Sequence, residues 1–139
     1  MSDHACPICL DGGPTDVIAE LPGCWLTMSD DAAPALPGTC ALFFRRHVVE
    51  LHELARDEAA QFMGAVQRVS ASLAEASGAV KINYEIHGNT IPHLHMHFFP
   101  RYGDDPFTGS PIDPRLRGSN DDMHRHLAIR QKLLERLVA

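Results

Sequence analysis

The sequence predicts one α+β domain, in which an antiparallel sheet of about five strands packs with one main helix and a C-terminal helix. Three observations support this prediction. Apolar residues alternate in several short segments, one long segment with helical spacing interrupts them, and a second helical segment closes the chain. With 139 residues, 45% of them apolar, the chain can bury the core of a single domain spanning residues 1–139.

The first third of the chain predicts an arm followed by three strands. Residues 1–13 form an arm that carries two cysteines. Residues 17–28 predict two short strands around a Pro-Gly turn, and residues 29–39 predict a loop interrupted by prolines. Residues 40–51 predict a strand that runs into a turn.

Two segments have the spacing of amphipathic helices. The main helix is expected to begin after an N-cap at Asp57 and to end at Gly78, with apolar residues recurring every three or four positions between them. The C-terminal helix is expected from about Asp121 to Val138, and both of its histidines are expected on the surface. Its apolar stripe is predicted to comprise Met123, Leu127, Leu133, Leu134 and Leu137.

Two more strands lie between these helices. Residues 79–86 alternate as a strand, and residues 87–92 form a glycine-containing loop. Residues 93–99 predict the last strand, which Pro100 is expected to stop. Residues 103–139 form the C-terminal tail and helix.

Charge and hydropathy exclude two classes of partner. The formal net charge of −6 argues against a nucleic-acid-binding surface, although a few placed donors could still hold a phosphate. No apolar run reaches 18 residues, so we expect no membrane span. The N-terminus lacks a basic segment followed by an apolar one, so we expect no signal peptide and a cytoplasmic location.

The four cysteines fall into two groups. Cys24 and Cys40 stand in apolar surroundings and are expected to be small buried hydrophobic residues. Cys6 and Cys9 form a C-x-x-C motif. A redox motif would need a thioredoxin-like βαβ context, which is absent, and half of a zinc site would need two more ligands.

Residues 93–99, HLHMHFF, place a histidine at every second position. Because side chains alternate between the faces of a strand, His93, His95 and His97 share one face with Phe99, while the intervening apolar residues enter the core. Residues on one face are separated by roughly 6.6 Å along the strand, which is awkward for three ligands of one tetrahedral metal. This spacing suits groups with different roles.

One of these roles could be nucleophilic. A neutral imidazole nitrogen can attack phosphorus near pH 7 while the other ring nitrogen keeps its proton on an acceptor. The flanking histidines and the N–H groups of the preceding loop could then donate to phosphate oxygens or to the leaving group. Two alternatives stay open: a metalloenzyme whose HxHxH cluster binds a catalytic metal, and a nucleotide-binding module with little turnover.

HLHMHFF fits H-φ-H-φ-H-φ-φ, and the sequence therefore resembles the histidine triad (HIT) nucleotide hydrolases and transferases. The step Gly88-Asn89-Thr90, Asn83, and the segment DAAPALPGTCALFFRRH at residues 31–47 resemble other parts of the family pattern. The resemblance covers residues 6–102, and the variant is most similar to bacterial members described as diadenosine-tetraphosphate hydrolases. It implies a HIT-like fold.

The resemblance implies a role for each histidine of the triad. His95 resembles the nucleophile that becomes covalently nucleotidylated, His97 the histidine that contacts the α-phosphate, and His93 the one that supports the triad. The expected activity is cleavage at the α-phosphate of a dinucleoside polyphosphate or nucleoside phosphoramidate, with hydrolysis favoured over transfer. A homodimer is expected from the resemblance alone.

The resemblance also implies substrate-binding residues. Asn83 and Thr90 resemble residues that contact and orient the phosphate, and Asp31 resembles the carboxylate that holds the ribose hydroxyls. Asn89 stands where the family usually has Gln, and Thr39 stands where it has the His of a Gly-His step. These two departures concern the leaving group and the rate more than the fold.

For the C-x-x-C pair the resemblance implies zinc. Some bacterial histidine triad proteins bind zinc between such a motif, the histidine after an RRH-like strand end, and the first triad histidine. The matching positions are Cys6, Cys9, His47 and His93, a set that suits a closed structural site. His4 and His52 compete as the fourth ligand, and free thiols or redox use remain alternatives.

Overall fold

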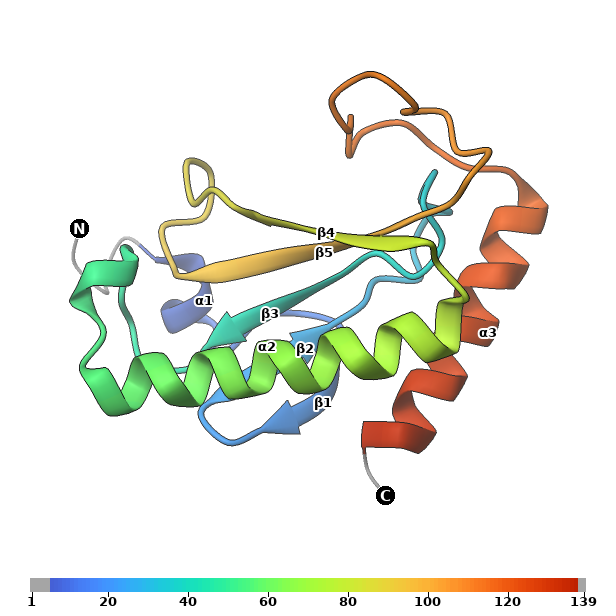
Figure 1. The fold of residues 1–139 in the computed structure, drawn as a ribbon. Coiled ribbons are helices and arrows are strands. Elements are labelled where there is room, and N and C mark those ends of the chain that lie inside the picture. The colour runs from blue at the N-terminus through green and yellow to red at the C-terminus, as the bar shows by residue number, and fades with distance from the viewer. Residues whose placement is uncertain (1–5, 138–139) are drawn as a thin grey trace.

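A computed structural model describes residues 6–137. It contains one antiparallel five-stranded sheet, three helices and a short 3-10 helix, so the predicted α+β class is confirmed (Figure 1). In chain order the elements are α1 (Pro7–Leu10), β1 (Val17–Leu21), β2 (Cys24–Thr27), β3 (Cys40–Phe44), η2 (Leu51–Glu53), α2 (Arg56–Ser77), β4 (Lys81–Ile86), β5 (His95–Arg101) and α3 (Asn120–Leu137). The strand order is β1-β2-β3-β5-β4.

The first hairpin forms where the sequence predicts it. Leu21 pairs with Cys24, so Pro22 and Gly23 alone make the turn. Proline fixes the first turn position, and Gly23 takes a φ of 74°, which a residue with a side chain adopts rarely. The adjoining β3 lies at the centre of the sheet, and all five of its residues are buried.

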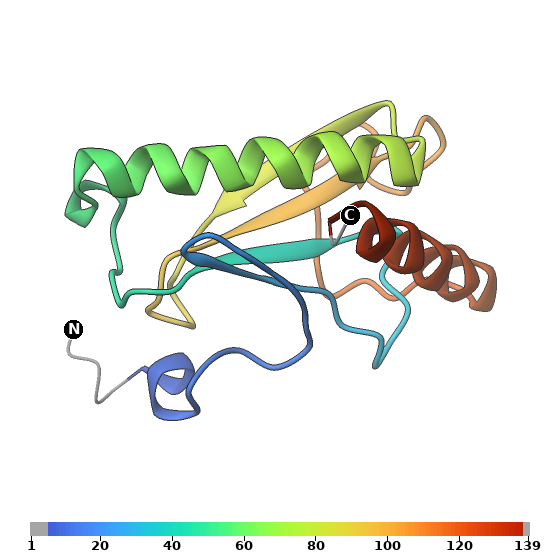
Figure 2. The same cartoon turned by 90° about the horizontal axis from the view of Figure 1, so that it is seen from below.

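The long helix α2 and the C-terminal helix α3 pack together and cover one face of the sheet. Leu94, Met96 and Phe98, the apolar residues between the histidines, are buried in the core between the sheet and these helices. The predicted division into an apolar and a histidine face is therefore confirmed for the strand from His95 onward, whereas His93 lies before it. Seen at right angles, α1 lies on the other side of the sheet from α2 (Figure 2).

The start of α2 differs from the prediction. The N-cap is Ala55, and Asp57 lies inside the first turn. The carboxylate of Glu58 accepts the Ala55 N–H at 2.9 Å and is itself held by Arg46. Glu58, the third helical residue, therefore stabilises the helix start in place of an N-cap side chain. The end agrees with the prediction, because Gly78 follows the helix with a φ of 67°.

Pro100 was expected to stop the last strand, but it does not. Strand β5 begins at His95, two residues later than predicted, and continues to Arg101. Its pairing with β3 ends at Phe98, so Pro100 is flanked by β4 alone. A proline is tolerated there because only one side of the strand needs hydrogen bonds.

The stripe of α3 also differs from the prediction. Its buried residues are His126, Ile129, Leu133 and Leu137, whereas Leu127 is 40% exposed. His124 is exposed as predicted, but the expected surface position of His126 is wrong. The predicted end at Val138 lies outside the described residues.

The two isolated cysteines are buried, as predicted. Cys24 and Cys40 both belong to the main core. Burial raises the pKa of Cys24 to about 11 and that of Cys40 to about 12, so both thiols stay protonated and unreactive at neutral pH. No helix within residues 6–137 is long and apolar enough to cross a membrane.

Candidate active site and Cys/His cluster

The face of the sheet opposite α2 carries two rows of side chains that cross the strands. In one row, Ala41 of β3 pairs with His97 of β5, which pairs in turn with Glu85 of β4. In the next row, Phe43 of β3 pairs with His95 of β5. The antiparallel register thus gathers the second and third triad histidines beside a small residue, an aromatic ring and a carboxylate.

Two contacts hold the ring of His95 in place, one at its face and one at its edge. The ring stacks on Phe43, with centroids 4.6 Å apart and planes 11° apart. Its Nδ1–H donates to the carbonyl oxygen of His93 at 2.7 Å, because a carbonyl can only accept. In neutral His95 the proton is therefore on Nδ1, and Nε2 carries the lone pair.

His97 lies edge-on to His95, with ring centroids 4.8 Å apart, and stacks on Phe99. Burial lowers the pKa of His97 to about 4, and charge repulsion from His95 and His87 adds to this, while Glu85 opposes it. At neutral pH His97 is therefore an uncharged imidazole, suited to donating or accepting a hydrogen bond.

Two cavities meet at His97 and Pro114. One, of 380 Å³, lies between β2, β3 and the C-terminal segment, and both Asp31 and Thr39 line it. The other, of 480 Å³, lies along the loop after β4; its lining is Glu85, His87, Gly88, Asn89, Thr90, Ile91, His95, His97, Ile112 and Pro114. Five predicted site residues therefore line one or both of these neighbouring cavities: Asp31, Asn89, Thr90, His95 and His97.

Asn83 is separated from this group. It lies on β4 opposite Phe99, on the same face of the sheet as His97, but it lines neither cavity. Its Oδ1 accepts a hydrogen bond from Arg101 at 3.0 Å. Arg101 also holds Asp105 through two hydrogen bonds, and this ion pair lowers the pKa of Asp105 to about 2.

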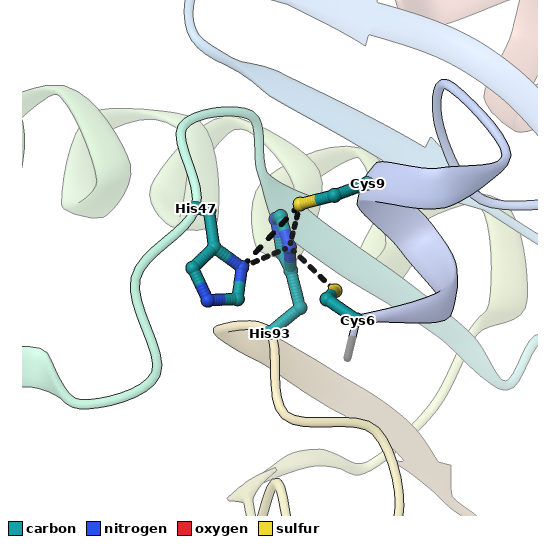
Figure 3. A group of neighbouring side chains, drawn as sticks. All are labelled: Cys6, Cys9, His47 and His93. Carbon is teal, nitrogen blue, oxygen red and sulfur yellow. Dashed lines mark hydrogen bonds between the residues drawn. The ribbon is translucent and has the colours of Figure 1, made fainter. Parts of the chain in front are cut away.

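His93 turns away from the other two triad histidines. Its Nε2–H donates to the carbonyl of Phe44 at 2.5 Å, so Nδ1 carries the lone pair. Nδ1 points into a cluster with Cys6, Cys9 and His47 (Figure 3). Among residues 6–137 this is the group whose side chains could hold a metal, and it includes neither His95 nor His97.

The spacing of the cluster fits a tetrahedral ion. His93 Nδ1 lies 3.4 Å from Cys6 Sγ, 3.6 Å from Cys9 Sγ and 3.4 Å from His47 Nδ1. Cys9 Sγ lies 3.4 Å from His47 Nδ1. Zinc bonds of roughly 2.0 Å to nitrogen and 2.3 Å to sulfur would separate tetrahedral ligand atoms by about 3.3–3.8 Å.

Three separate segments bring the cluster together. Cys6 is the N-cap of α1 and Cys9 lies in its single turn, so a short helix presents both sulfur atoms on one side. His47 follows β3, and the carbonyl that fixes His93 is that of Phe44 in the same segment. His52 does not belong to the cluster, and His4 lies outside the described residues.

Sequence reasoning missed the contribution of α3. His126 is 1% exposed and lines the cavity that contains Asp31. Its Nδ1 accepts the N–H of Gly38 at 2.9 Å, and its Nε2–H donates to the carbonyl of Ser29 at 2.8 Å. The available signal was the helical spacing of His126, which lies on the same stripe as Ile129 and Leu133. A polar side chain on a buried stripe needs hydrogen-bond partners such as these.

Known proteins share the fold of this chain. Residues 13–104 match the model of the HIT domain. Histidine triad proteins from Sinorhizobium meliloti 1021 and Bradyrhizobium japonicum superpose with TM-scores of 0.70 and 0.66, at 27% and 28% identity; the alignments cover 87% and 84% of this chain and 88% and 89% of theirs.

A zinc-bound histidine triad family protein from Mycobacterium smegmatis superposes with a TM-score of 0.65 at 23% identity, over 96% of both chains. No curated protein sequence matches the chain significantly. Since the family model covers most of the chain, including the histidine strand, the chain belongs to the HIT domain family.

Proposed function

We propose that the protein is a nucleotidyl hydrolase in which His95 Nε2 attacks the α-phosphorus of a nucleotide. One observation carries the proposal: the 2.7 Å hydrogen bond from His95 Nδ1–H to the His93 carbonyl. It leaves Nε2 as a basic nitrogen beside the 480 Å³ cavity, without requiring a change of tautomer. The stack on Phe43 keeps the ring in that orientation.

The reaction has two displacement steps. In the first, the Nε2 lone pair forms a bond to phosphorus, and the bond to the leaving group breaks with its electron pair on the departing atom. In the second, water attacks the nucleotidyl-imidazole, the P–N bond breaks, and a nucleoside monophosphate and free His95 result. The substrate is a dinucleoside polyphosphate or a nucleoside phosphoramidate.

Each of the two cavities accommodates one half of the substrate. The nucleoside occupies the 380 Å³ cavity, where Asp31 accepts hydrogen bonds from the ribose hydroxyls. The leaving group occupies the 480 Å³ cavity, where Asn89, Thr90 and the backbone of their loop bind phosphate oxygens. His97, which lines both cavities, donates to the α-phosphate between them.

Asn83 has a narrower role in this proposal than the family pattern suggests. Arg101 already uses its amide oxygen. Because Asn83 lines neither cavity, its NH₂ group could donate only to a part of the substrate that extends beyond them along β4. An Asn83→Asp variant, which keeps the acceptor for Arg101 and removes the donor, tests this by its KM.

We also propose that Cys6, Cys9, His47 and His93 bind a structural zinc ion. The four ligand atoms lie within 4.8 Å of one another, and a Cys2His2 set fills every tetrahedral position, so no site remains for substrate. The zinc-bound relative from Mycobacterium smegmatis supports the choice of metal. When bound, zinc supplies a cross-link between the N-terminal arm and the strand of the nucleophile.

A homodimer and a cytoplasmic location complete the proposal. Strand β4 is an edge strand, and two of its residues, Tyr84 and Ile86, are 43% and 37% exposed to solvent. Pairing two such edges would cover both side chains and the unpaired backbone groups. A Tyr84→Lys variant should shift the sedimentation coefficient from that of a dimer to that of a monomer.

The central experiment is a search for the covalent intermediate. Wild-type protein is mixed with a panel of adenylated and guanylated substrates, quenched in base, and His95 is examined by mass spectrometry. We expect a nucleotidyl adduct on His95 and release of a nucleoside monophosphate, both absent in His95→Asn. Undiminished hydrolysis by His95→Asn would refute the proposal.

A further inference from the structure

Glu85 and His87 form a pair at the edge of the 480 Å³ cavity, which is proposed to hold the leaving group. The proposed role of His95 does not use this pair. Glu85 is the last residue of β4 to face the same side as the triad, directly opposite His97. His87 follows β4 at the start of the loop that carries Asn89. Both side chains line the 480 Å³ cavity together with His95.

The pair has a defined hydrogen-bond direction. His87 Nε2 lies 2.7 Å from Glu85 Oε1, and the carboxylate can only accept, so the imidazole keeps a proton on Nε2. The proton on Nδ1 is then the one that His87 can give up or take back. The side chains of His87 and Glu85 are 57% and 34% exposed, so a ligand in the cavity can reach them.

Departure of the leaving group requires a proton donor in this cavity. When the bond from phosphorus to the leaving atom breaks, that atom gains an electron pair, and an amine or alkoxide leaves slowly unless a proton arrives. Besides His87, the titratable groups that line the cavity are Glu85, His95 and His97. His95 is the attacking group, and the pKa of about 4 leaves His97 almost entirely unprotonated at neutral pH.

We propose that His87, oriented by Glu85, is the proton donor to the leaving group. This inference rests on the proposed nucleophilic role of His95. In the first step the Nδ1 proton of His87 moves to the leaving atom as its bond to phosphorus breaks, and His87 becomes neutral. In the second step Nδ1 takes a proton from the attacking water, and cationic His87 is restored.

The arrangement also selects a class of leaving group. Among residues 6–137, no lysine or arginine lines this cavity, whereas the carboxylate of Glu85 does. The positive charge of His87 is already paired with Glu85, so a leaving group with several negative charges would find no further cation there, whereas a neutral amine or alcohol gains the proton it needs. Of the two proposed substrate classes, the pair therefore favours a single uncharged leaving group over a polyphosphate.

The test is a series of para-substituted phenyl esters of adenosine 5′-phosphate whose leaving phenols range from 4-nitrophenol to 4-methoxyphenol. Adduct formation on His95 is followed in single turnovers, so the first step is measured directly. His87→Gln should lose about 100-fold in rate with the 4-methoxyphenyl ester and less than about tenfold with the 4-nitrophenyl ester. Glu85→Gln should change the dependence in the same direction by a smaller factor.

His52→Gln is the matched control, because it removes an exposed histidine on η2 that does not line either cavity. Equal losses by His87→Gln across the whole series, or no loss, would overturn the role of the pair while leaving the His95 adduct intact. If the wild-type protein forms no adduct with any ester, both this inference and the proposed function fail.

Discussion

The main chain of His93 joins the Cys/His cluster to the candidate nucleophile. Its ring nitrogen Nδ1 points at Cys6 and Cys9, while its carbonyl accepts the Nδ1–H of His95 at 2.7 Å. A displacement of His93 would therefore reach His95 through one hydrogen bond. Because His93 lies just before β5, its ring turns away from that of His95, while its carbonyl still couples the two residues.

This coupling predicts that removing the sulfur ligands affects both stability and activity. A Cys6→Ser/Cys9→Ser variant should contain no stoichiometric zinc by elemental analysis, should unfold at a lower temperature, and should lose activity while keeping His95. The chemical reason is that serine hydroxyls are poor zinc ligands, so His93 would lose the proposed ion that fixes its ring.

Cys24→Ala is the control for this variant. It removes a thiol from the main core and leaves the cluster unchanged, so it should retain zinc at the wild-type ratio. A double serine variant that keeps zinc and depends on it for hydrolysis would instead favour a catalytic metal elsewhere on the chain.

The stack between Phe43 and His95 should contribute to the rate. Phe43→Leu keeps an apolar side chain and removes the parallel ring at 4.6 Å. An aromatic contact of this kind is worth roughly 0.5–1.5 kcal/mol, so we expect kcat to fall by about two- to tenfold with little change in KM. Phe44→Leu, on the opposite face of β3 against Phe62, should lower the melting temperature more than it lowers kcat.

The sequence was sufficient for features that depend on local periodicity. The two-residue period of 93–99 correctly divided apolar from histidine positions, and Gly78 marked the end of α2. One of its errors came from a partner distant in the chain, and the other from a local contact that the pattern does not reveal. Pro100 continues β5 because β3 has already ended there, and α2 begins early because Glu58 caps it from within.

The candidate site was predictable only in part for the same reason. The HxHxH pattern names the histidines but does not say that His93 faces Cys6 while His95 faces Phe43. That division depends on a main-chain path, because His93 lies just before β5 rather than in it. The cluster itself was expected from family resemblance, since nothing in the local sequence links residue 6 to residue 93.

His126 should stabilise the wall of the nucleoside cavity. His126→Ala removes the acceptor for the Gly38 N–H and the donor to the Ser29 carbonyl, both in segments that border Asp31. Leaving the buried Gly38 N–H and the partly buried Ser29 carbonyl without these partners should lower the unfolding free energy by about 1–3 kcal/mol. Calorimetric titration with adenosine monophosphate should show weaker binding.

The neighbouring His124 provides a matched control on the same helix. It is exposed, so His124→Ala should leave both stability and nucleotide binding close to wild type. Equal effects of the two alanine variants would mean that α3 acts through its helical stability rather than through the hydrogen bonds of His126.

The lowered pKa of His97 should make stability depend on pH. An unfolded histidine titrates near 6.5, whereas His97 in the folded protein titrates near 4, chiefly because burial disfavours its charged form. Between these values the unfolded state binds more protons, so stability rises with pH. The contribution is fully present above about pH 6.5 and is lost as the pH falls toward 4.

Urea unfolding at pH 7 and pH 5 tests this directly. After allowance for partial solvent screening, His97→Asn should reduce the loss of unfolding free energy between the two pH values by about 1 kcal/mol relative to wild type. His126, whose pKa burial also lowers, contributes with the same sign and stays in place in both proteins. A variant whose stability falls as steeply as that of the wild type would show that His97 is already protonated in the folded state at pH 5, and the assignment of His97 as a neutral group beside His95 would then be wrong.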